Sequence, residues 1–256
     1  MSRITDKFKQ LKSERKTALI PYIMAGDPSL QATKKYVLDL EKSGADIIEL
    51  GVPFSDPLAD GPTIQRAAER SLKHGTTLSK VIGLVQEIRK KSEIPLVLMT
   101  YYNPVFKYGV ELFIKRAVRA GIDGVIIPDL IPDEATDFIR IAKKYKLDTI
   151  FLLAPTSTRE RINKVVTSAS GFVYFVSITG ITGAKLSVGK QMKSTLNSVR
   201  KITNKPVAVG FGISSPEEAA IVAKLADGVI IGSAIVKLIA KRKDINIFVK
   251  KIRKTI

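Results

Sequence analysis

The chain has 256 residues, of which 45% are hydrophobic, and it carries a formal net charge of +18. A chain of this length can bury one large core, and we expect residues 1–256 to form a single domain. The sequence contains no cysteine, which excludes a disulfide framework, a thiolate metal site and a cysteine nucleophile. It also contains no apolar run of the roughly 20 residues that span a bilayer.

The N-terminal segment, MSRITDKFKQLKSERK (1–16), has no apolar signal core and contains acidic residues. We therefore expect neither a secretory nor a transit peptide, and we expect a cytoplasmic protein. Ile4, Phe8 and Leu11 recur at helical spacing within this segment. The spacing predicts a short N-terminal helix that packs against the body of the protein.

Eight short runs rich in apolar and β-branched residues follow along the chain. They cover residues 17–25, 46–50, 95–101, 124–128, 148–154, 172–177, 206–210 and 228–232. Longer stretches with helical periodicity separate them, such as SLQATKKYVLDLEKSG (29–44) and SPEEAAIVAKLA (215–226). This alternation indicates βαβ units and a parallel sheet. Strands that are apolar throughout indicate that both faces of the sheet are covered.

Three junctions between a helix and the next strand resemble one another: SGADIIELG, AGIDGVIIP and LADGVIIGS. They indicate a partly concealed internal repeat. About eight strands in this alternation is the number found in a (β/α)8 TIM barrel. We predict that α/β fold, with the N-terminal helix added. An open doubly wound sheet is the alternative, but it usually has fewer units and a glycine-rich loop after its first strand, where this chain has AGDPS.

The high positive charge raises the alternative of a nucleic-acid-binding protein. Lysine and arginine are spread along the chain, however, mostly on the polar faces of predicted helices. The densest cluster, AKRKDINIFVKKIRKTI (240–256), keeps an apolar face and is not accompanied by a basic and aromatic binding motif. Anionic substrates explain the charge as well, and we expect neither nucleic acid nor membrane as a partner.

Glu49 lies in an otherwise apolar strand, and the loop GVPFSDPLADGP (51–62) follows it. In a barrel, the end of that strand faces the mouth, where burial raises a carboxyl pKa until the group exchanges protons near neutral pH. A structural glutamate paired with a lysine or arginine is the alternative. The loop favours a functional role, because it adds three prolines and two acids, Asp56 and Asp60. Each aspartate alone would also fit an ordinary turn.

Three loops after predicted strands indicate a phosphate site. GFGISSPEEA (210–219) leaves its strand through glycines and offers Ser214 or Ser215 as a helix N-cap. IIGSAIVK (230–237) runs from the last strand into a helical pattern. These are the loops after strands seven and eight, where barrels bind phosphate through backbone N–H groups and a helix N-terminus. Gly183, after strand six, permits a third close approach, although glycines that only form tight turns are the alternative.

Other chemistries lack the residues that they need. His74 is the only histidine, which excludes a Ser-His-Asp triad and a histidine-rich metal site, and we expect it to cap a helix or lie at the surface. None of the predicted strands contains or ends in the lysine that Schiff-base aldol chemistry requires. The remaining chemistry is acid–base catalysis by carboxylates on a phosphorylated small molecule, without a cofactor or a metal.

The motif ELGVPFSDPLADGPTIQ (49–65) resembles the signature of the tryptophan synthase α subunit family. AGDPS (25–29), GITG (180–183), GFGISSP (210–216) and GSAIVK (232–237) resemble further family motifs in the same order, so the resemblance covers essentially the whole chain. It implies retro-aldol cleavage of indole-3-glycerol phosphate to indole and glyceraldehyde 3-phosphate. It also implies an α2β2 complex with a pyridoxal-phosphate β subunit, which receives the indole through a tunnel and joins it to serine.

The resemblance implies that Glu49 moves the protons and that Asp60 accepts a hydrogen bond from the indole N–H. The residues implied for the indole pocket and its approaches are Tyr22, Met99, Tyr101, Ile126 and Tyr174. Those implied for phosphate binding are Gly183, Phe211, Gly212, Gly232 and Ser233. Asp56 and Thr182 would meet when two mobile loops close over the substrate. The surface implied for docking the β subunit is YNPVF (102–106) with Pro53 and Pro132.

Two positions depart from the family pattern. Ile178 stands where well-known bacterial members have arginine, and Tyr22 stands where phenylalanine is familiar, which brings a hydroxyl into the pocket. The loop 177–189 is rich in glycine, serine and threonine, and we expect it to be mobile in the empty site. Two alternatives remain within the resemblance: a stand-alone lyase that releases free indole, and a catalytically silent barrel that activates a β subunit.

Overall fold

A computed structural model describes residues 2–176, 185–210 and 212–256. The strands in these ranges are β1 (Ala18–Met24), β2 (Ile48–Gly51), β3 (Leu96–Met99), β4 (Gly124–Ile126), β5 (Asp148–Ile150), β6 (Leu152–Leu153), β7 (Val173–Val176), β8 (Val207–Gly210) and β9 (Gly228–Ile231). Every predicted strand is confirmed. The run predicted at 148–154 is divided into β5 and β6.

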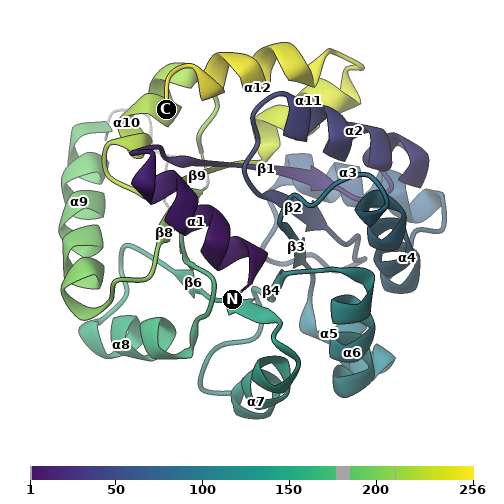
Figure 1. The fold of residues 1–256 in the computed structure, drawn as a ribbon, viewed down its shortest axis with the longest axis horizontal. Coiled ribbons are helices and arrows are strands. Elements are labelled where there is room, and N and C mark those ends of the chain that lie inside the picture. The colour runs from purple at the N-terminus through teal and green to yellow at the C-terminus, as the bar shows by residue number, and fades with distance from the viewer. Residues whose placement is uncertain (1, 177–184, 211) are drawn as a thin grey trace.

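The strands form one parallel sheet in the order β5-β4-β3-β2-β1-β9-β8-β7-β6. β5 and β6 stand at the two ends of this order, yet only Phe151 separates them in the chain. The oxygen of Phe151 also accepts a hydrogen bond from the N–H of Tyr174 in β7 (3.1 Å). The sheet therefore closes into a ring, which Figure 1 shows end-on. This confirms the predicted barrel and excludes the open doubly wound sheet.

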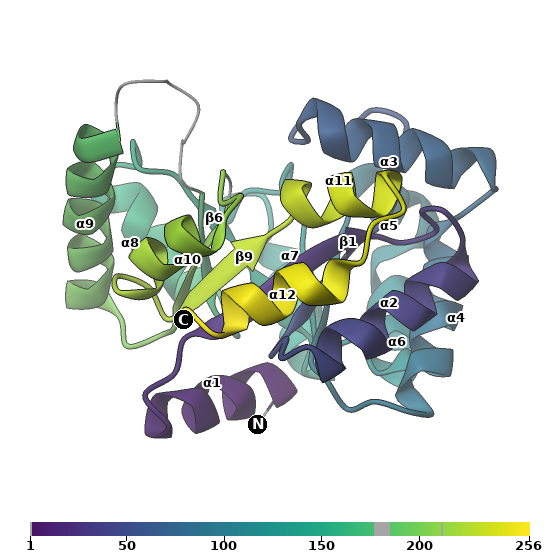
Figure 2. The same ribbon diagram turned by 90° about the horizontal axis from the view of Figure 1, so that it is seen from above.

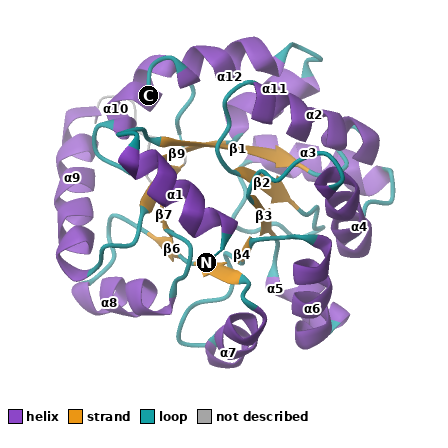
Figure 3. Ribbon diagram, in the orientation of Figure 1, coloured by secondary structure: helices purple, strands orange, loops and turns teal. Residues whose placement is uncertain are grey.

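Helices surround the ring of strands (Figure 3). They are α1 (Arg3–Ser13), α2 (Leu30–Lys42), α3 (Pro62–Lys73), α4 (Leu78–Arg89), α5 (Tyr102–Tyr108), α6 (Val110–Ala120), α7 (Thr136–Tyr145), α8 (Arg159–Ser168), α9 (Lys185–Ile202), α10 (Pro216–Ala223), α11 (Ser233–Ala240) and α12 (Ile245–Arg253). β2, β3 and β9 are each followed by two helices rather than one. His74 caps the C-terminal end of α3, in agreement with its expected role.

Two buried clusters make up the core, one inside the barrel and one between the strands and the helices. Along β1 the two clusters alternate, because successive side chains of a strand point to opposite faces. Ile20 and Tyr22 belong to the interior cluster, whereas Leu19 and Ile23 belong to the outer one. Every strand buried in this way is covered on both faces, as its continuous apolar sequence predicts.

Helix α1 covers the end of the barrel at which the strands begin (Figure 2). Ile4, Phe8 and Leu11 form its buried side and join the interior cluster, so the predicted N-terminal helix is confirmed. Ser2 caps this helix, and its hydroxyl donates a hydrogen bond to the carboxylate of Asp148 at the start of β5. The helix is thereby fixed to the strands by apolar packing and by a polar contact.

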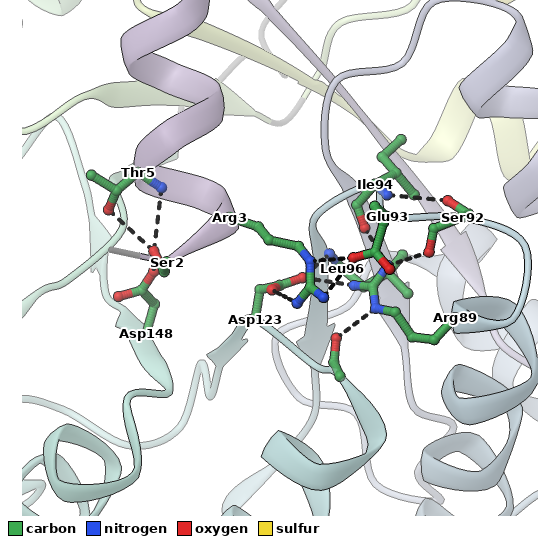
Figure 4. A network of polar contacts seen from close by, with 11 residues as sticks. Ser2, Arg3, Thr5, Arg89, Ser92, Glu93, Ile94, Leu96, Asp123 and Asp148 are labelled. Atoms are coloured by element: carbon green, nitrogen blue, oxygen red, sulfur yellow. Dashed lines mark hydrogen bonds and ion pairs between the residues drawn. The ribbon is translucent and has the colours of Figure 1, made fainter.

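An ionic network adjoins the contact made by Ser2 (Figure 4). Asp123, just before β4, has a side chain that is only 5% exposed, and it contacts two guanidinium groups. Arg3 on α1 approaches one carboxylate oxygen at 3.0 Å, and Arg89 on α4 approaches the other at 2.7 Å. Arg89 also donates to the backbone oxygen of Gly121 (2.8 Å). This network joins α1, α4 and the segment before β4 beneath the barrel.

Within the described ranges, no helix combines the length and the hydropathy needed to cross a bilayer. The loop that we expect to be mobile lies partly outside these ranges, at 177–184. Its remaining residues, 185–189, begin helix α9.

Candidate active site

Glu49 lies on β2 and points into the barrel. Its neighbours Ile48 and Leu50 belong to the outer cluster, so the alternation of the strand directs Glu49 inward. It pairs in register with Tyr22 on β1 and with Val97 on β3. Glu49 is 1% exposed, and neither of its carboxyl oxygens has a hydrogen-bond partner among the described residues. The alternative of a structural ion pair with lysine or arginine therefore has no support in those residues.

Asp60 lies in the loop between β2 and α3, and several hydrogen bonds fix its position. Its backbone N–H donates to the backbone oxygen of Pro57 (3.0 Å). Its backbone oxygen accepts a hydrogen bond from the side-chain amide of Gln65 (2.8 Å). Tyr101 follows β3, and its hydroxyl accepts a hydrogen bond from the N–H of Ala59 (3.0 Å). The same hydroxyl is hydrogen-bonded to the carboxylate of Asp60. The second carboxyl is thus attached to the end of a neighbouring strand.

A cavity of about 540 Å³ lies where these strands end, within the range of about 300–1,000 Å³ typical of small-molecule sites. The residues that line it are Tyr22, Glu49, Asp60, Gly61, Ile64, Met99, Tyr174, Gly212, Ile213, Ser214, Ile230, Gly232, Ser233, Ala234, Lys237, Leu238 and Phe248. Both carboxyl groups are in its wall. The remaining lining is mostly apolar, which suits a ligand with a large apolar part.

The two carboxyl groups differ in acidity. Burial raises the pKa of Glu49 to about 8, and the charge of Asp60 adds to this effect. Burial also raises the pKa of Asp60, to about 6, while the hydrogen bond from Tyr101 opposes the increase. At neutral pH, Glu49 is therefore mostly protonated and Asp60 mostly ionised. A proton donor and a negative charge thus share one cavity, which is an arrangement suited to acid–base chemistry.

Two tyrosines, Tyr22 on β1 and Tyr174 on β7, bring their rings to the cavity. A Cβ on Gly51 would lie 2.0 Å from the Tyr22 hydroxyl, and a Cβ on Gly210 would lie 2.5 Å from the Tyr174 hydroxyl. Glycine at the ends of β2 and β8 therefore provides the space that the rings occupy. Burial raises the pKa of both phenols well above the usual value, so both hydroxyls keep their protons.

The loop after β8 turns through Gly212, whose φ of +78° lies in the left-handed region that favours glycine. Ser215 is the N-cap of α10, which decides between the two serines that the sequence offered. The carboxylate of Glu218 accepts hydrogen bonds from the N–H (2.8 Å) and the hydroxyl (2.9 Å) of Ser214. Donors at the N-terminal end of α10 are thus already hydrogen-bonded to a carboxylate of the same chain.

The loop after β9 leads directly into α11, with Gly232 as the N-cap and Ser233 as the first helical residue. Gly232 supplies no side-chain cap, and the first turn contains no acidic residue. The first N–H groups of a helix have no partner within it and form a region of positive potential. This end of the cavity therefore favours an anion such as phosphate.

The structure brings most of the predicted site residues together. Those that line the cavity are Tyr22, Glu49, Asp60, Met99, Tyr174, Gly212, Gly232 and Ser233. Tyr101 and Ile126 do not line it: Tyr101 is hydrogen-bonded to Asp60, and Ile126 is fully buried in the interior cluster. Asp56 is exposed in the loop after β2. Thr182, Gly183 and Phe211, together with Ile178, lie outside the described residues.

The sequence did not single out one side of the wall. It consists mainly of Ile64, Ile213, Ile230, Ala234, Lys237, Leu238 and Phe248. Spacing could have indicated some of these residues, because positions three or four apart share a helix face and positions two apart share a strand face. Lys237 follows Ser233 by four residues, and Ile230 precedes Gly232 by two. No local pattern could have placed Phe248, which comes from α12.

Comparison with known proteins agrees with this geometry. The family model described as tryptophan synthase alpha chain matches residues 8–255. The tryptophan synthase alpha chain of Geotalea uraniireducens is 55% identical over 238 residues, covering 93% of this chain and 89% of that one. The Geotalea daltonii protein of the same name is 53% identical over 237 residues, covering 93% and 90% of the two chains.

Solved structures give the same result. Tryptophan synthase subunit alpha from Legionella pneumophila superposes with a TM-score of 0.92 at 40% identity, covering 100% of this chain and 98% of that one. A chain of Mycobacterium tuberculosis tryptophan synthase superposes with a TM-score of 0.91 at 38% identity, covering 99% and 98%. The resemblance drawn from the sequence motifs is confirmed, and the chain belongs to the tryptophan synthase alpha chain family.

Proposed function

We propose that Glu49 and Asp60 together carry out the reaction of this family, the cleavage of indole-3-glycerol phosphate to indole and glyceraldehyde 3-phosphate. The lyase activity follows from family membership at high identity over nearly the whole chain. The roles of the residues are our proposal. The observation that supports them is the pair of carboxyl groups in one cavity, one mostly neutral and one mostly ionised at pH 7.

Glu49 is the proton donor and the proton acceptor. In its neutral form it protonates carbon 3 of the indole ring, which places a positive charge on the ring nitrogen. As a carboxylate it then removes the proton from the hydroxyl group on the carbon attached to the ring. The O–H electrons form the aldehyde carbonyl, and the electrons of the broken carbon–carbon bond return to the ring. Glu49 ends the reaction protonated, as it began, and a positioned group of this kind contributes roughly 10²–10⁴-fold to the rate.

Asp60 stabilises the intermediate. Its carboxylate accepts a hydrogen bond from the ring N–H, and this bond strengthens as positive charge develops on the nitrogen. Asp60 performs this role only when it is ionised, and its pKa of about 6 meets that condition at neutral pH. Tyr22, Met99 and Tyr174 form the walls that hold the indole ring. Tyr101 supports Asp60 through a hydrogen bond.

The phosphate binds at the opposite side, where the loops after β8 and β9 meet. Gly212, Gly232 and Ser233 supply backbone N–H groups, and the N-terminal end of α11 adds its favourable potential. Phe211 and Gly183, outside the described residues, complete this site in our proposal. We also propose that Asp56 meets Thr182 when the loops after β2 and β7 close over the substrate. The exposed position of Asp56 leaves its carboxylate available for that contact.

Membership of the family implies a β-subunit partner. We propose that this partner docks on the surface formed by Leu58, Phe106 and Ile131. Leu58, Phe106 and Ile131 are 85%, 66% and 37% exposed, which is unusual for large apolar side chains. They follow the adjacent strands β2, β3 and β4, so they lie toward the end of the barrel that holds the cavity. Pro53 and Pro132, which the resemblance placed on this surface, are buried by the chain itself.

The experiment measures indole release from indole-3-glycerol phosphate by the chain alone and after addition of a tryptophan synthase β subunit. Glu49→Gln is the test variant. Glu69→Gln, an exposed glutamate on α3, is its matched control. We expect slow release that increases with the partner, disappears in Glu49→Gln and is unchanged in Glu69→Gln.

The other outcomes separate the two alternatives. High release without a partner, unchanged when the β subunit is added, would favour a stand-alone lyase. Activation of the β subunit by well-folded protein that releases no indole would favour a catalytically silent barrel. Full activity of Glu49→Gln would refute the role of Glu49 whichever alternative holds.

A further inference from the structure

Lys237 is the only lysine or arginine among the described residues that line the cavity. The wall also contains the carboxyls of Glu49, which is mostly protonated at pH 7, and of Asp60, which is mostly ionised. A substrate with an indole ring at one end and a phosphate at the other carries its negative charge on the phosphate. Carboxylates repel that group and an ammonium attracts it. Lys237 therefore marks the part of the cavity where the phosphate is most favourably placed.

The position of Lys237 on α11 supports the same assignment. Lys237 lies four residues after Ser233, which is one helical turn. Helical side chains lean toward the N-terminus of their helix, so the Lys237 side chain extends over the first turn. That turn carries backbone N–H groups without intrahelical partners and has no capping side chain. An anion bound there would contact backbone donors and an ammonium group together.

No contact of the Lys237 side chain among the described residues gives it a structural role. It is exposed, and no ion pair or hydrogen bond joins its side chain to another described residue. The neighbouring helix α10 provides the contrast, since Glu218 supplies an acid to the N–H of Ser214 at 2.8 Å. α11 has no acidic residue in its first turn and no side-chain cap, so the N–H groups at its N-terminal end, which adjoins the cavity, can receive an external anion.

We propose that Lys237 binds the phosphate of the substrate at the N-terminal end of α11, an inference that rests on the proposed phosphate site. The phosphate takes no part in breaking the carbon–carbon bond, so its charge is the same in the substrate and in the transition state. The contact therefore contributes equally to both states. Removing it raises KM and leaves kcat unchanged.

The experiment compares Lys237→Gln and Lys237→Arg with Lys241→Gln. Lys241 lies one turn further along the same side of α11, is also exposed and is not among the cavity residues. KM and kcat for indole-3-glycerol phosphate cleavage are measured for each, together with the Kd of glycerol 3-phosphate as a probe of the phosphate site. We expect Lys237→Gln to raise KM and the probe Kd by about tenfold, the effect of one charge-assisted hydrogen bond. Lys237→Arg retains most of the affinity, and Lys241→Gln changes neither constant by more than about twofold.

Equal losses in Lys237→Gln and Lys241→Gln would overturn the inference, because they would reflect only the overall positive charge of the protein. An unchanged KM and probe Kd in Lys237→Gln would also overturn it. Failure of the underlying phosphate site has a different result: the wild-type protein would then bind glycerol 3-phosphate no better than uncharged glycerol. A loss of kcat at constant KM in Lys237→Gln would show that the residue acts on the chemical step instead.

Discussion

The Tyr101 hydroxyl is hydrogen-bonded to the carboxylate of Asp60 and accepts a hydrogen bond from the N–H of Ala59 (3.0 Å). One side chain at the end of β3 thus fixes the loop that follows β2 and adjusts the acidity of the carboxyl in that loop. Burial alone would raise the pKa of Asp60 above about 6. The hydrogen bond from Tyr101 lowers this pKa and so favours the ionised form of Asp60.

Tyr101→Phe is expected to move the acidic limb of the pH–rate profile to higher pH. The variant loses the hydrogen bond that lowers the pKa of Asp60, while the burial that raises it remains. The measurement is kcat/KM for indole-3-glycerol phosphate cleavage between pH 5 and pH 9. Tyr36→Phe, on α2 away from the cavity, is the control and keeps the wild-type profile. An acidic limb at the wild-type position in Tyr101→Phe would show that the tyrosine does not control Asp60.

The wild-type protein is expected to have a bell-shaped dependence of kcat/KM on pH. The rate rises through about pH 6 as Asp60 ionises and falls above about pH 8 as Glu49 loses the proton that it must donate. Steady-state rates in buffers of constant ionic strength measure both limbs. A rate that continues to increase above pH 9 would contradict the role of neutral Glu49 as the proton donor.

Glu49→Gln is expected to stabilise the fold, and increasingly so with rising pH. An unfolded glutamate loses its proton near pH 4.5, whereas folded Glu49 keeps it up to about pH 8. The folded state binds more protons in this window, so the contribution of Glu49 to stability falls as the pH rises from about 4.5 to about 8. Glu49→Gln does not lose stability in this way, so its free energy of unfolding exceeds that of the wild-type protein by on the order of a few kcal/mol at pH 8. Urea unfolding of both proteins at pH 5 and pH 8 measures the difference, and an equal gain at both values would contradict the raised pKa.

Arg89→Met is expected to destabilise the protein by about 3–5 kcal/mol, because it leaves the buried carboxylate of Asp123 without its closest cation. The Arg89 side chain is 10% exposed and lies 2.7 Å from Asp123. Arg3→Met is the comparison, since Arg3 contacts the same carboxylate but its side chain is 42% exposed. Its loss costs about 0–1 kcal/mol. Denaturant unfolding at neutral pH measures both, and equal effects would contradict the dependence on burial.

Gly51→Ala is expected to lower both stability and kcat/KM. The added Cβ would lie 2.0 Å from the Tyr22 hydroxyl, so the ring must leave its place in the cavity wall, at a cost of about 1–3 kcal/mol. Adding Tyr22→Phe removes the closest contact but leaves the ring carbon at 2.6 Å, so it restores only part of the loss. Gly83→Ala, inside α4 with open space around it, is the control and stabilises the helix by about 0.5–1 kcal/mol. Equal stability of Gly51→Ala and the wild-type protein would contradict the close packing of Tyr22.

The barrel was predictable because each strand carries its own signal. Continuous apolar runs with β-branched residues identified eight strands, of which one became β5 and β6, and a lone acid inside such a run identified Glu49. The break between β5 and β6 was not predictable, since Phe151 is as apolar as its neighbours and only pairing with β7 separates the two strands. The local sequence determines where strands form, whereas pairing with residues distant in the chain determines where a strand is interrupted.

The same distinction applies to the site. Gly232 could be found because loops at strand ends meet at one end of a barrel, whereas Asp60 also fitted an ordinary turn and was singled out by the resemblance to the family motif. The distinction between Tyr101, which supports Asp60, and Tyr22, which lines the cavity, depends on side-chain directions that no spacing reveals. Phe248 was missed because α12 reaches the cavity only after the chain has passed around the barrel. The resemblance implied that Pro53 and Pro132 lie on a docking surface, yet the chain buries both.

The attachment of α1 beneath the barrel has a consequence for the order in which the chain acquires its structure during synthesis. Ser2 and Arg3 leave the ribosome well before their partners Asp148 and Asp123, which lie 146 and 120 residues later. The first helix therefore has no docking site until more than half of the chain has been made. Contacts at such separations slow folding, because a long loop must close before they form. A helix that is made early therefore docks only after β4 and β5 have been made.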